Sequence, residues 1–218
     1  MIKEIAQSYT DEFHRLQWEL FPEEKTTPGR VIQITASRFA EGVTTTTLAL
    51  ATSMARTRNS EDVLVVEANL RDPAFHQVLG LGSNGSLARV LEGQEDVWGN
   101  IERVEAYGIS VLPAGHSPGA SVDEDLEPYL QNLGDTLSKL RGKYRYILVD
   151  SPPLVPYRDS NIIARVTDGV IFVVEANVTR SQVLDFALRR MQTVEAKILG
   201  LVLNKREFRI PNWLYRYL

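Results

Sequence analysis

Hydrophobic residues along this chain follow two spacings, which predict strands that alternate with helices. Short runs rich in Val, Ile and Leu, typical of buried strands, occur at 31–34, 63–66, 146–149, 169–174 and 198–203. Between them, apolar residues recur at helical spacing at 44–54, 127–140, 158–166 and 181–194. A short helix at 73–79, another within 80–93 and a small strand within 101–112 complete the pattern. This order predicts an α/β fold, doubly wound, with a mostly parallel sheet flanked by helices on both faces.

Two terminal segments lie outside this alternation. Residues 1–21 carry apolar side chains at helical spacing, so residues 1–29 are predicted to be one amphipathic helix and a proline-containing linker. Residues 30–206 form the predicted domain, and residues 207–218 a basic and aromatic tail. In this tail Trp213, Leu214 and Tyr217 are expected to dock on the domain, on a partner or on a membrane surface. The alternative is that Tyr215 and Tyr217 are phosphoacceptors for an active kinase.

The first strand runs through a polar loop into a helix, which is the layout of a phosphate-binding loop. Aligned on the motif G-x-x-x-x-G-K-[ST], the chain has Ser37 and Gly42 at the glycines, Val43 at the lysine and Thr44 at the hydroxyl that reaches Mg²⁺. Val43 supplies neither a charge nor a hydrogen bond for the phosphates. The loop is therefore either a threonine-rich turn without a ligand or a degenerate phosphate site.

If the loop does hold phosphate, another cation must replace the motif's lysine. Arg38, Arg71 or a residue of a neighbouring subunit could supply that charge. Removing one electrostatic contact to the transition state typically costs on the order of 10²–10³ in rate, so efficient turnover is not expected.

Acidic side chains end two of the predicted strands. Asp150 follows 146–149 in the manner of a Walker B aspartate, which holds Mg²⁺ directly or through water; otherwise it caps the next turn. Glu67 follows 63–66 and either coordinates a cation or is a solvated residue at a strand end. The histidines are scattered singly, without metal-ligand spacing, at His14, His76 and His116.

Composition narrows the class of protein. A chain of 218 residues is long enough for one sizeable α/β domain. Its net charge of −4 argues against general nucleic-acid binding, and without cysteine it forms neither a disulfide nor a thiolate metal site. No apolar run approaches the roughly 20 residues of a membrane span, so a cytoplasmic protein is expected.

Several stretches, in this order, resemble one family. They are ITASRFAEGVTTTTLALA, VLVVEANLRDPAFH, GSLARVLEG, VLPAGHSPG, YRYILVDSPPLVPYRDSNIIARVTDGVIFVV and ILGLVLN. They resemble the cytoplasmic domain of bacterial tyrosine kinases of the CpsD/CapB type, known as BY-kinases, which partner polysaccharide co-polymerases. These kinases belong to the MinD/ParA-like P-loop ATPases. The resemblance covers nearly the whole chain and implies the same fold.

The resemblance also implies two sets of site residues. Its nucleotide-binding positions are Gly42, Val43, Thr44, Thr45, Arg71 and Asn204. Its metal positions, if Mg²⁺ is bound, are Asp150, Thr44 and Glu67.

The departures from the family pattern indicate weakened chemistry. Besides Val43, the family's Asp-x-Asp motif is Glu67-Ala68-Asn69 here, and the amide of Asn69 cannot act as a base near neutral pH. Asp11, His14 and Gln17 stand where the family has its Glu-x-x-Arg-x-x-Arg oligomerisation motif, so the family's ring assembly is not expected. A homo-oligomer of another kind stays open.

These features favour a catalytically degenerate regulator or adaptor of exopolysaccharide or capsule biosynthesis, with no catalytic residue assigned. ATP or ADP with Mg²⁺ is expected to bind weakly or not at all. The expected partner is an inner-membrane polysaccharide co-polymerase of the chain-length-determinant type, which would hold the protein at the inner membrane from the cytoplasmic side. The alternative is an active, divergent ATPase or tyrosine autokinase. A ParA-like positioning protein is a weaker option, because it would need an ATP-dependent dimer.

Overall fold

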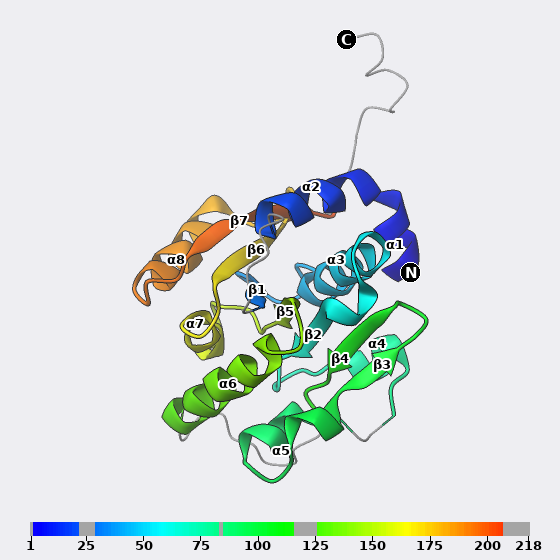
Figure 1. Cartoon of the computed structure of the whole chain (residues 1–218). Helices are drawn as coiled ribbons and strands as arrows, with labels where there is room; N and C mark the ends of the chain where they lie inside the picture. Colours follow the sequence, from blue (N-terminus) through cyan, green and yellow to red (C-terminus); the bar gives the residue numbers. More distant parts are fainter. Residues whose placement is uncertain (1, 22–28, 83–84, 116–125, 207–218) are drawn as a thin grey trace.

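A seven-stranded sheet forms the centre of the molecule (Figure 1). The structure, a computed structural model, describes residues 2–21, 29–82, 85–115 and 126–206, with the backbone alone at 126–130. The strands lie in the order β3-β4-β2-β5-β1-β6-β7. Their bounds are β1 Arg30–Ala36, β2 Val63–Glu67, β3 Glu102–Val104, β4 Ile109–Leu112, β5 Tyr146–Asp150, β6 Gly169–Glu175 and β7 Ile198–Asn204. Every pairing is parallel except that of β3 with β4.

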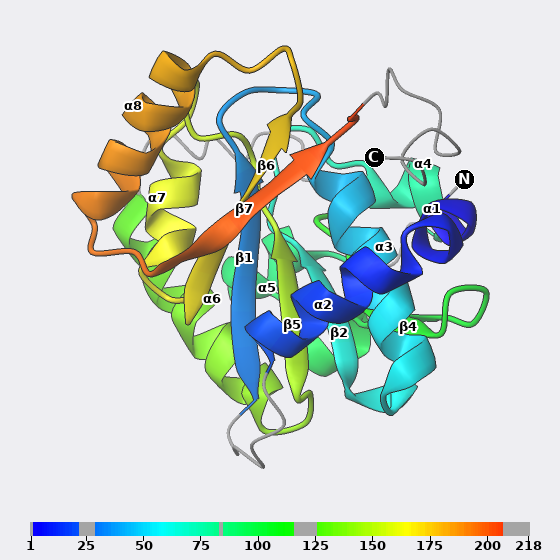
Figure 2. The same ribbon diagram turned by 90° about the horizontal axis from the view of Figure 1, so that it is seen from above.

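Helices cover both faces of the sheet (Figure 2). The helices α1 to α3 lie on one face, and α6 to α8 lie on the other. The bounds are α1 Ile2–Ser8, α2 Thr10–Leu20, α3 Val43–Thr57, α4 Phe75–Leu79, α5 Leu87–Leu91, α6 Leu126–Arg141, α7 Asp159–Ala164 and α8 Ser181–Gln192, with 3-10 turns η1 Ser60–Asp62 and η2 Val97–Asn100. The predicted doubly wound α/β fold with a mostly parallel sheet is confirmed.

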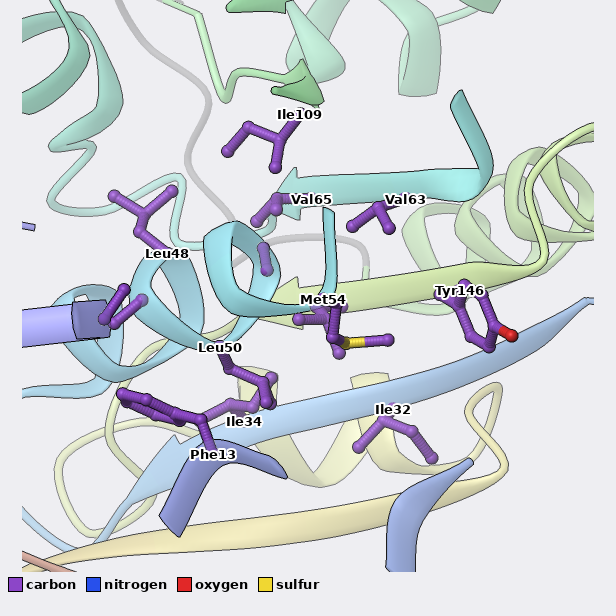
Figure 3. Close-up of a cluster of buried hydrophobic side chains, with 14 of the residues drawn as sticks. Phe13, Ile32, Ile34, Leu48, Leu50, Met54, Val63, Val65, Ile109 and Tyr146 are labelled. Carbon is purple, nitrogen blue, oxygen red and sulfur yellow. The ribbon is translucent and has the colours of Figure 1, made fainter. Parts of the chain in front are cut away.

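The core consists of apolar layers on the two faces of the sheet. In β1, Val31 packs on one face, while Ile32 and Ile34 pack on the other, because successive side chains in a strand point to opposite faces. Figure 3 shows the second layer, in which these two isoleucines meet Leu50 and Met54 of α3. A parallel sheet buried on both faces requires such continuous apolar strands.

The N-terminal segment forms two helices rather than the single helix predicted over 1–21. The chain breaks at Tyr9, between α1 and α2. The Thr10 hydroxyl donates to the carbonyls of Ala6 (3.2 Å) and Gln7 (2.8 Å), which stabilises the end of α1. Both helices contribute to the core against α3, through Ile2, Ala6, Phe13 and Leu20. Most of the predicted linker and the whole predicted tail lie outside the described residues.

The small strand predicted within 101–112 is also corrected. It is a pair of antiparallel strands, β3 and β4, that pair from Glu102 with Val111 to Val104 with Ile109. Gly108 lies in the connecting turn with a φ of +67°, a left-handed conformation that favours glycine.

The register of the central strands brings the candidate site together. Ile34, two residues before the end of β1, lies beside Asp150 at the end of β5, and Asp150 lies beside Glu67 at the end of β2. The loops after these three strands therefore share the carboxyl edge of the sheet, where open α/β folds bind ligands.

Candidate functional site

The loop between β1 and α3 has the turn geometry of a phosphate-binding loop. Gly42 caps the N-terminus of α3 with a φ of +95°, and its carbonyl accepts the first helical hydrogen bond, from Thr46 (3.0 Å). The backbone N–H groups of the first turn of this fifteen-residue helix therefore point toward the carboxyl edge of the sheet.

A buried carboxylate braces this loop from within. Glu41, which is 2% exposed, accepts a hydrogen bond from the Arg38 backbone N–H (3.0 Å) and another from the Thr179 hydroxyl. Thr179 lies between β6 and α8, so this side chain ties the loop to a second loop at the same edge of the sheet. Glu41 is not among the predicted site residues; an acidic residue inside a phosphate loop is the signal that could have identified it.

The end of β7 holds the same loop from another side. The Asn204 amide donates to the Glu41 carbonyl (2.9 Å), and the Lys205 ammonium donates to the Ala40 carbonyl (2.7 Å). A Cβ on Gly42 would lie 2.1 Å from the Asn204 amide nitrogen, so another residue there would displace the Asn204 side chain as well as strain the backbone at a φ of +95°. Asn204, predicted to contact nucleotide, thus contacts the loop itself. Lys205 is a cation at this loop that sequence reasoning missed, because nothing in the sequence indicates that its side chain turns back.

Val43, at the position of the motif's lysine, is the first residue of α3 and packs against the core layer beneath the helix. Ser37, at the first glycine, is buried, and its hydroxyl has no hydrogen-bond partner among the described residues. Thr45 is half-buried on the first turn of α3 and lines a groove beside the loop. The loop is therefore well formed in its backbone, and the side chain in the lysine position is apolar.

Thr44 and Asp150 form the contact that the metal-site prediction requires. The Thr44 hydroxyl donates to Asp150 Oδ2 at 2.8 Å, and Asp150 is 2% exposed. Burial raises the pKa of the Asp150 carboxyl to about 8; the bond from Thr44 opposes this shift and the charge of Glu67 adds to it. Oxygen ligands of this kind suit Mg²⁺, which takes one or two carboxylates together with nucleotide phosphates.

Glu67 is a structural brace and not a solvated residue at a strand end, so that interpretation is wrong. It is 1% exposed. Its Oε1 accepts the backbone N–H groups of Ala74 (2.5 Å) and Phe75 (2.7 Å), and its Oε2 accepts that of Ala114 (2.9 Å). Burial raises the pKa of the Glu67 carboxyl, and these three backbone bonds oppose the shift. The carboxylate thereby joins the ends of β2 and β4 to the start of α4.

Arg71 is held by an acidic partner. Its Nε lies 2.7 Å from Asp159 Oδ2, and its guanidinium stacks over the Tyr157 ring, 4.3 Å from the centroid. A second guanidinium nitrogen donates to Asp159 Oδ1 (3.2 Å), which makes the pair bidentate. The charge offered as a replacement for the missing lysine is therefore already neutralised by Asp159. Arg38 remains exposed at the loop.

The residues present fit Mg²⁺ only in part. Thr44 and Asp150 offer oxygens side by side, while both oxygens of Glu67 already accept backbone hydrogen bonds. No cluster of three or more His, Cys, Asp or Glu side chains that could hold a metal ion occurs among the described residues. Any metal bound here would therefore depend on phosphate oxygens for most of its ligands.

Comparison with known sequences identifies relatives with named activities. A family model described as "Cellulose biosynthesis protein BcsQ" matches residues 30–199. The chain is 27% identical over 155 residues to "Tyrosine-protein kinase ptk" of Acinetobacter johnsonii, covering 71% of this chain and 20% of that protein. It is 28% identical over 147 residues to "Succinoglycan biosynthesis transport protein ExoP" of Rhizobium meliloti, covering 66% of this chain and 18% of that protein. It thus spans about a fifth of the length of these two proteins.

A relative of similar length and two solved structures extend the comparison. "Tyrosine-protein kinase CpsD" of Streptococcus agalactiae is 27% identical over 177 residues, which cover 81% of this chain and 74% of that protein. The VpsO kinase domain superposes with a TM-score of 0.79 at 27% identity, covering 94% of this chain and 98% of that chain. MinD of Pyrococcus horikoshii with Mg-ADP, at 23% identity and a TM-score of 0.67 over 87% of this chain and 76% of that chain, shares the fold. The resemblance to bacterial tyrosine kinases on a MinD-like fold is confirmed.

Proposed function

Because the chain belongs to the family of the cellulose biosynthesis protein BcsQ, we propose that it is a regulator or adaptor in bacterial exopolysaccharide or capsule biosynthesis. The relatives named for succinoglycan biosynthesis and as tyrosine kinases support a place in such a pathway. In this proposal its nucleotide site is degenerate, and the protein does not work as an efficient kinase. The main support for a degenerate site is the side chain of Val43. It is apolar and packs on the core, and it occupies the position of the phosphate-binding lysine.

The electrostatics of the site support this proposal. The motif's lysine neutralises charge on the β- and γ-phosphates as the bond between them breaks, and valine cannot. Arg71 is paired with Asp159, Glu41 lies within the loop, and Asp150 accepts a hydrogen bond from Thr44 at its end. Bound triphosphate would thus lack the lysine that normally offsets its charge.

Should ATP or ADP bind with Mg²⁺, Thr44 and Asp150 would hold the metal. The backbone of Gly42 to Thr45 would hold the phosphates. The metal would supply charge neutralisation at the phosphates. Glu67, predicted as a third metal ligand, would act instead through its brace, by fixing the loop after β2. We expect this binding to be weak or absent.

The proposed partner is an inner-membrane polysaccharide co-polymerase of the chain-length-determinant type, an assignment that rests on family resemblance. No helix in the described part of the chain is long and apolar enough to cross a membrane. We propose that this partner holds the chain at the cytoplasmic side of the inner membrane. We propose no contact with nucleic acid, in keeping with the net charge of −4.

Calorimetric titration with Mg-ATP and Mg-ADP tests the degenerate site. We expect no saturable heat at protein concentrations able to detect a Kd of about 100 μM. Val43→Lys should gain binding by roughly 10- to 100-fold, the effect of one or two charge-assisted hydrogen bonds. Val43→Met is the matched control, because it adds a long side chain without a charge. Micromolar binding by the unmodified chain would contradict the proposal.

Complementation in cells tests the role in the pathway. Deletion of the gene should reduce exopolysaccharide, and Asp150→Ala should restore it as well as the unmodified chain does, since no turnover is required. Circular dichroism of the purified variant verifies its fold. A folded Asp150→Ala protein that fails to restore the polymer would show that chemistry at this site is needed.

An active, divergent ATPase or tyrosine autokinase is the second candidate. The 2.8 Å contact between Thr44 and Asp150 favours it, together with the exposed cations Arg38 and Lys205 at the loop. If the chain is such an enzyme, we expect it to release phosphate from ATP at a measurable rate. Asp150→Ala should lower that rate by about 10²-fold or more. This candidate also expects loss of turnover in Arg38→Met or Lys205→Met, which the first candidate does not.

A further inference from the structure

An apolar groove lies between the N-terminal helices and the carboxyl end of β7. Its volume is about 480 Å³, within the range of roughly 300–1,000 Å³ typical of ligand sites. The first turn of α3 lines it through Thr45 and Thr46, and α1 and α2 lie on this same side of the sheet (Figure 2). We propose that this groove binds the chain's own C-terminal segment, residues 207–218. This inference does not depend on the proposed function.

Large apolar side chains are exposed in this groove. Leu203 on β7 is 57% exposed and Tyr9 between α1 and α2 is 46% exposed, and both line it. Ile5, Phe13, Leu16 and Val202 supply the rest of its apolar wall. An apolar surface of this kind, rimmed by polar groups, is characteristic of a site that is covered by a partner segment.

Among possible partner segments, the C-terminal segment begins nearest to the groove. Arg206, the last described residue, itself lines the groove. An extended chain advances about 3.3–3.6 Å per residue, so two or three residues beyond Arg206 are enough to fold back over the groove. Because the segment is tethered at the rim, its effective concentration is on the order of millimolar. A tethered segment therefore outcompetes a free ligand of weak affinity.

The composition of the segment matches the groove. Its apolar and aromatic side chains are Phe208, Ile210, Trp213, Leu214, Tyr217 and Leu218. It also carries Arg209 and Arg216, while Glu12 lines the groove and Asp11 stands next to it on the first turn of α2. Two basic residues, Lys205 and Arg206, also line the groove. Lys205 is paired with Glu175 at 3.2 Å, which reduces its repulsion of the arginines of the segment.

Tryptophan fluorescence tests the proposal on the full-length chain. The protein has three tryptophans, so Trp18→Phe with Trp98→Phe leaves Trp213 as the only one. We expect its emission to be blue-shifted relative to the chain unfolded in urea and weakly quenched by acrylamide. Leu16→Asp, which places a charge in the groove wall, should abolish the blue shift and raise quenching to that of the unfolded chain. Phe186→Asp is the matched control on α8, where Phe186 is 53% exposed and remote from the groove, and it should change neither.

A second variant keeps the test decisive if Leu16→Asp fails to fold. Glu12→Arg changes only an exposed charge and should increase acrylamide quenching of Trp213 at low salt. Emission of Trp213 that matches the unfolded chain in the parent protein would overturn the proposal. A blue shift that disappears on dilution would also overturn it, because the segment would then be held by a second copy. So would a blue shift that appears only when vesicles are added, because the segment would then bind a lipid surface.

Discussion

At the scale of single residues, Asp150 is the group whose charge should respond to pH near neutrality. In the folded chain its carboxyl keeps a proton up to about pH 8, against an ordinary pKa of 3.8. Between these values the folded state binds the extra proton, so the free energy of unfolding falls as pH rises, by at most about 1.4 kcal/mol per pH unit. Above the folded pKa the cost of the buried charge is fully present.

Asp150→Asn should remove this dependence. The amide oxygen can still accept the Thr44 hydroxyl, and the side chain cannot ionise. We expect urea unfolding of the variant to vary less steeply between about pH 5 and pH 8, and its stability to exceed that of the unmodified chain at the upper end. Asp135→Asn, at an exposed position on α6, is the control and should leave the pH dependence intact. Parallel pH profiles for Asp150→Asn and the unmodified chain would refute the expected titration.

Glu67 makes a different prediction, because both of its carboxyl oxygens accept backbone hydrogen bonds. Glu67→Gln keeps one acceptor for Ala74 and Phe75 but turns an NH₂ group toward the Ala114 N–H, so two donors face each other. An unmade hydrogen bond in a buried site costs about 1–3 kcal/mol. Urea denaturation should show a loss of that size, whereas the exposed Glu61→Gln should stay within about 0.5 kcal/mol. A neutral effect of Glu67→Gln would mean that the brace does not stabilise the fold.

At the scale of elements, the sequence predicted the strands well because apolar runs in a parallel sheet are buried on both faces. It predicted less where local signals compete: the break at Tyr9 divided one helical pattern into two helices, and the turn at Gly108 divided one strand into two. The positions of Thr44 and Asp150 follow from motif spacing. The partners of Glu67 and Arg71 do not, because Ala114 and Asp159 are distant in sequence and only the assembled sheet brings them together.

The contact between the phosphate loop and β7 predicts coupling between two elements. Gly42→Ala should cost more than about 1 kcal/mol, from its φ of +95° and from the 2.1 Å approach to Asn204. Asn204→Ala should cost about 1 kcal/mol by loss of its bond to the Glu41 carbonyl. The double variant should cost less than the two together, since the clash is gone. If the stability loss of the double variant in urea denaturation equals the sum of the two single losses, the contact between Gly42 and Asn204 is contradicted.

Gly80→Ala supplies the matched control for this pair. Gly80 also has a left-handed φ, +67°, but no atom of the described part of the chain lies within 4 Å of the Cβ it would gain. Its substitution therefore measures the backbone strain alone. We expect Gly42→Ala to be the more costly of the two, and the difference to disappear in the Asn204→Ala background.

At the scale of the whole molecule, the N-terminal helices are part of the main core and not an appendage. Phe13 packs in the same layer as Ile32, Ile34 and Met54 (Figure 3). Leu20 belongs to the same apolar layer. Polar contacts strengthen this packing: the Gln17 amide donates to the Ser53 hydroxyl (2.9 Å), and Gln17 Oε1 accepts the Thr57 hydroxyl (2.9 Å). A helix pair bound through both apolar and polar contacts should unfold together with the sheet.

Phe13→Ala tests this cooperativity. Phe13 is 8% exposed, and truncating a buried phenylalanine costs about 3–5 kcal/mol. If α2 and the sheet form one unit, urea unfolding followed by circular dichroism and by tryptophan fluorescence should shift to lower urea together and stay coincident. Phe186→Ala on α8, where the side chain is 53% exposed, should change stability by less than about 0.5 kcal/mol. A first transition in Phe13→Ala that changes the fluorescence of Trp18 on α2 and leaves most of the circular dichroism unchanged would instead make these helices a separate unit, which would leave the groove beside β7 without one of its walls.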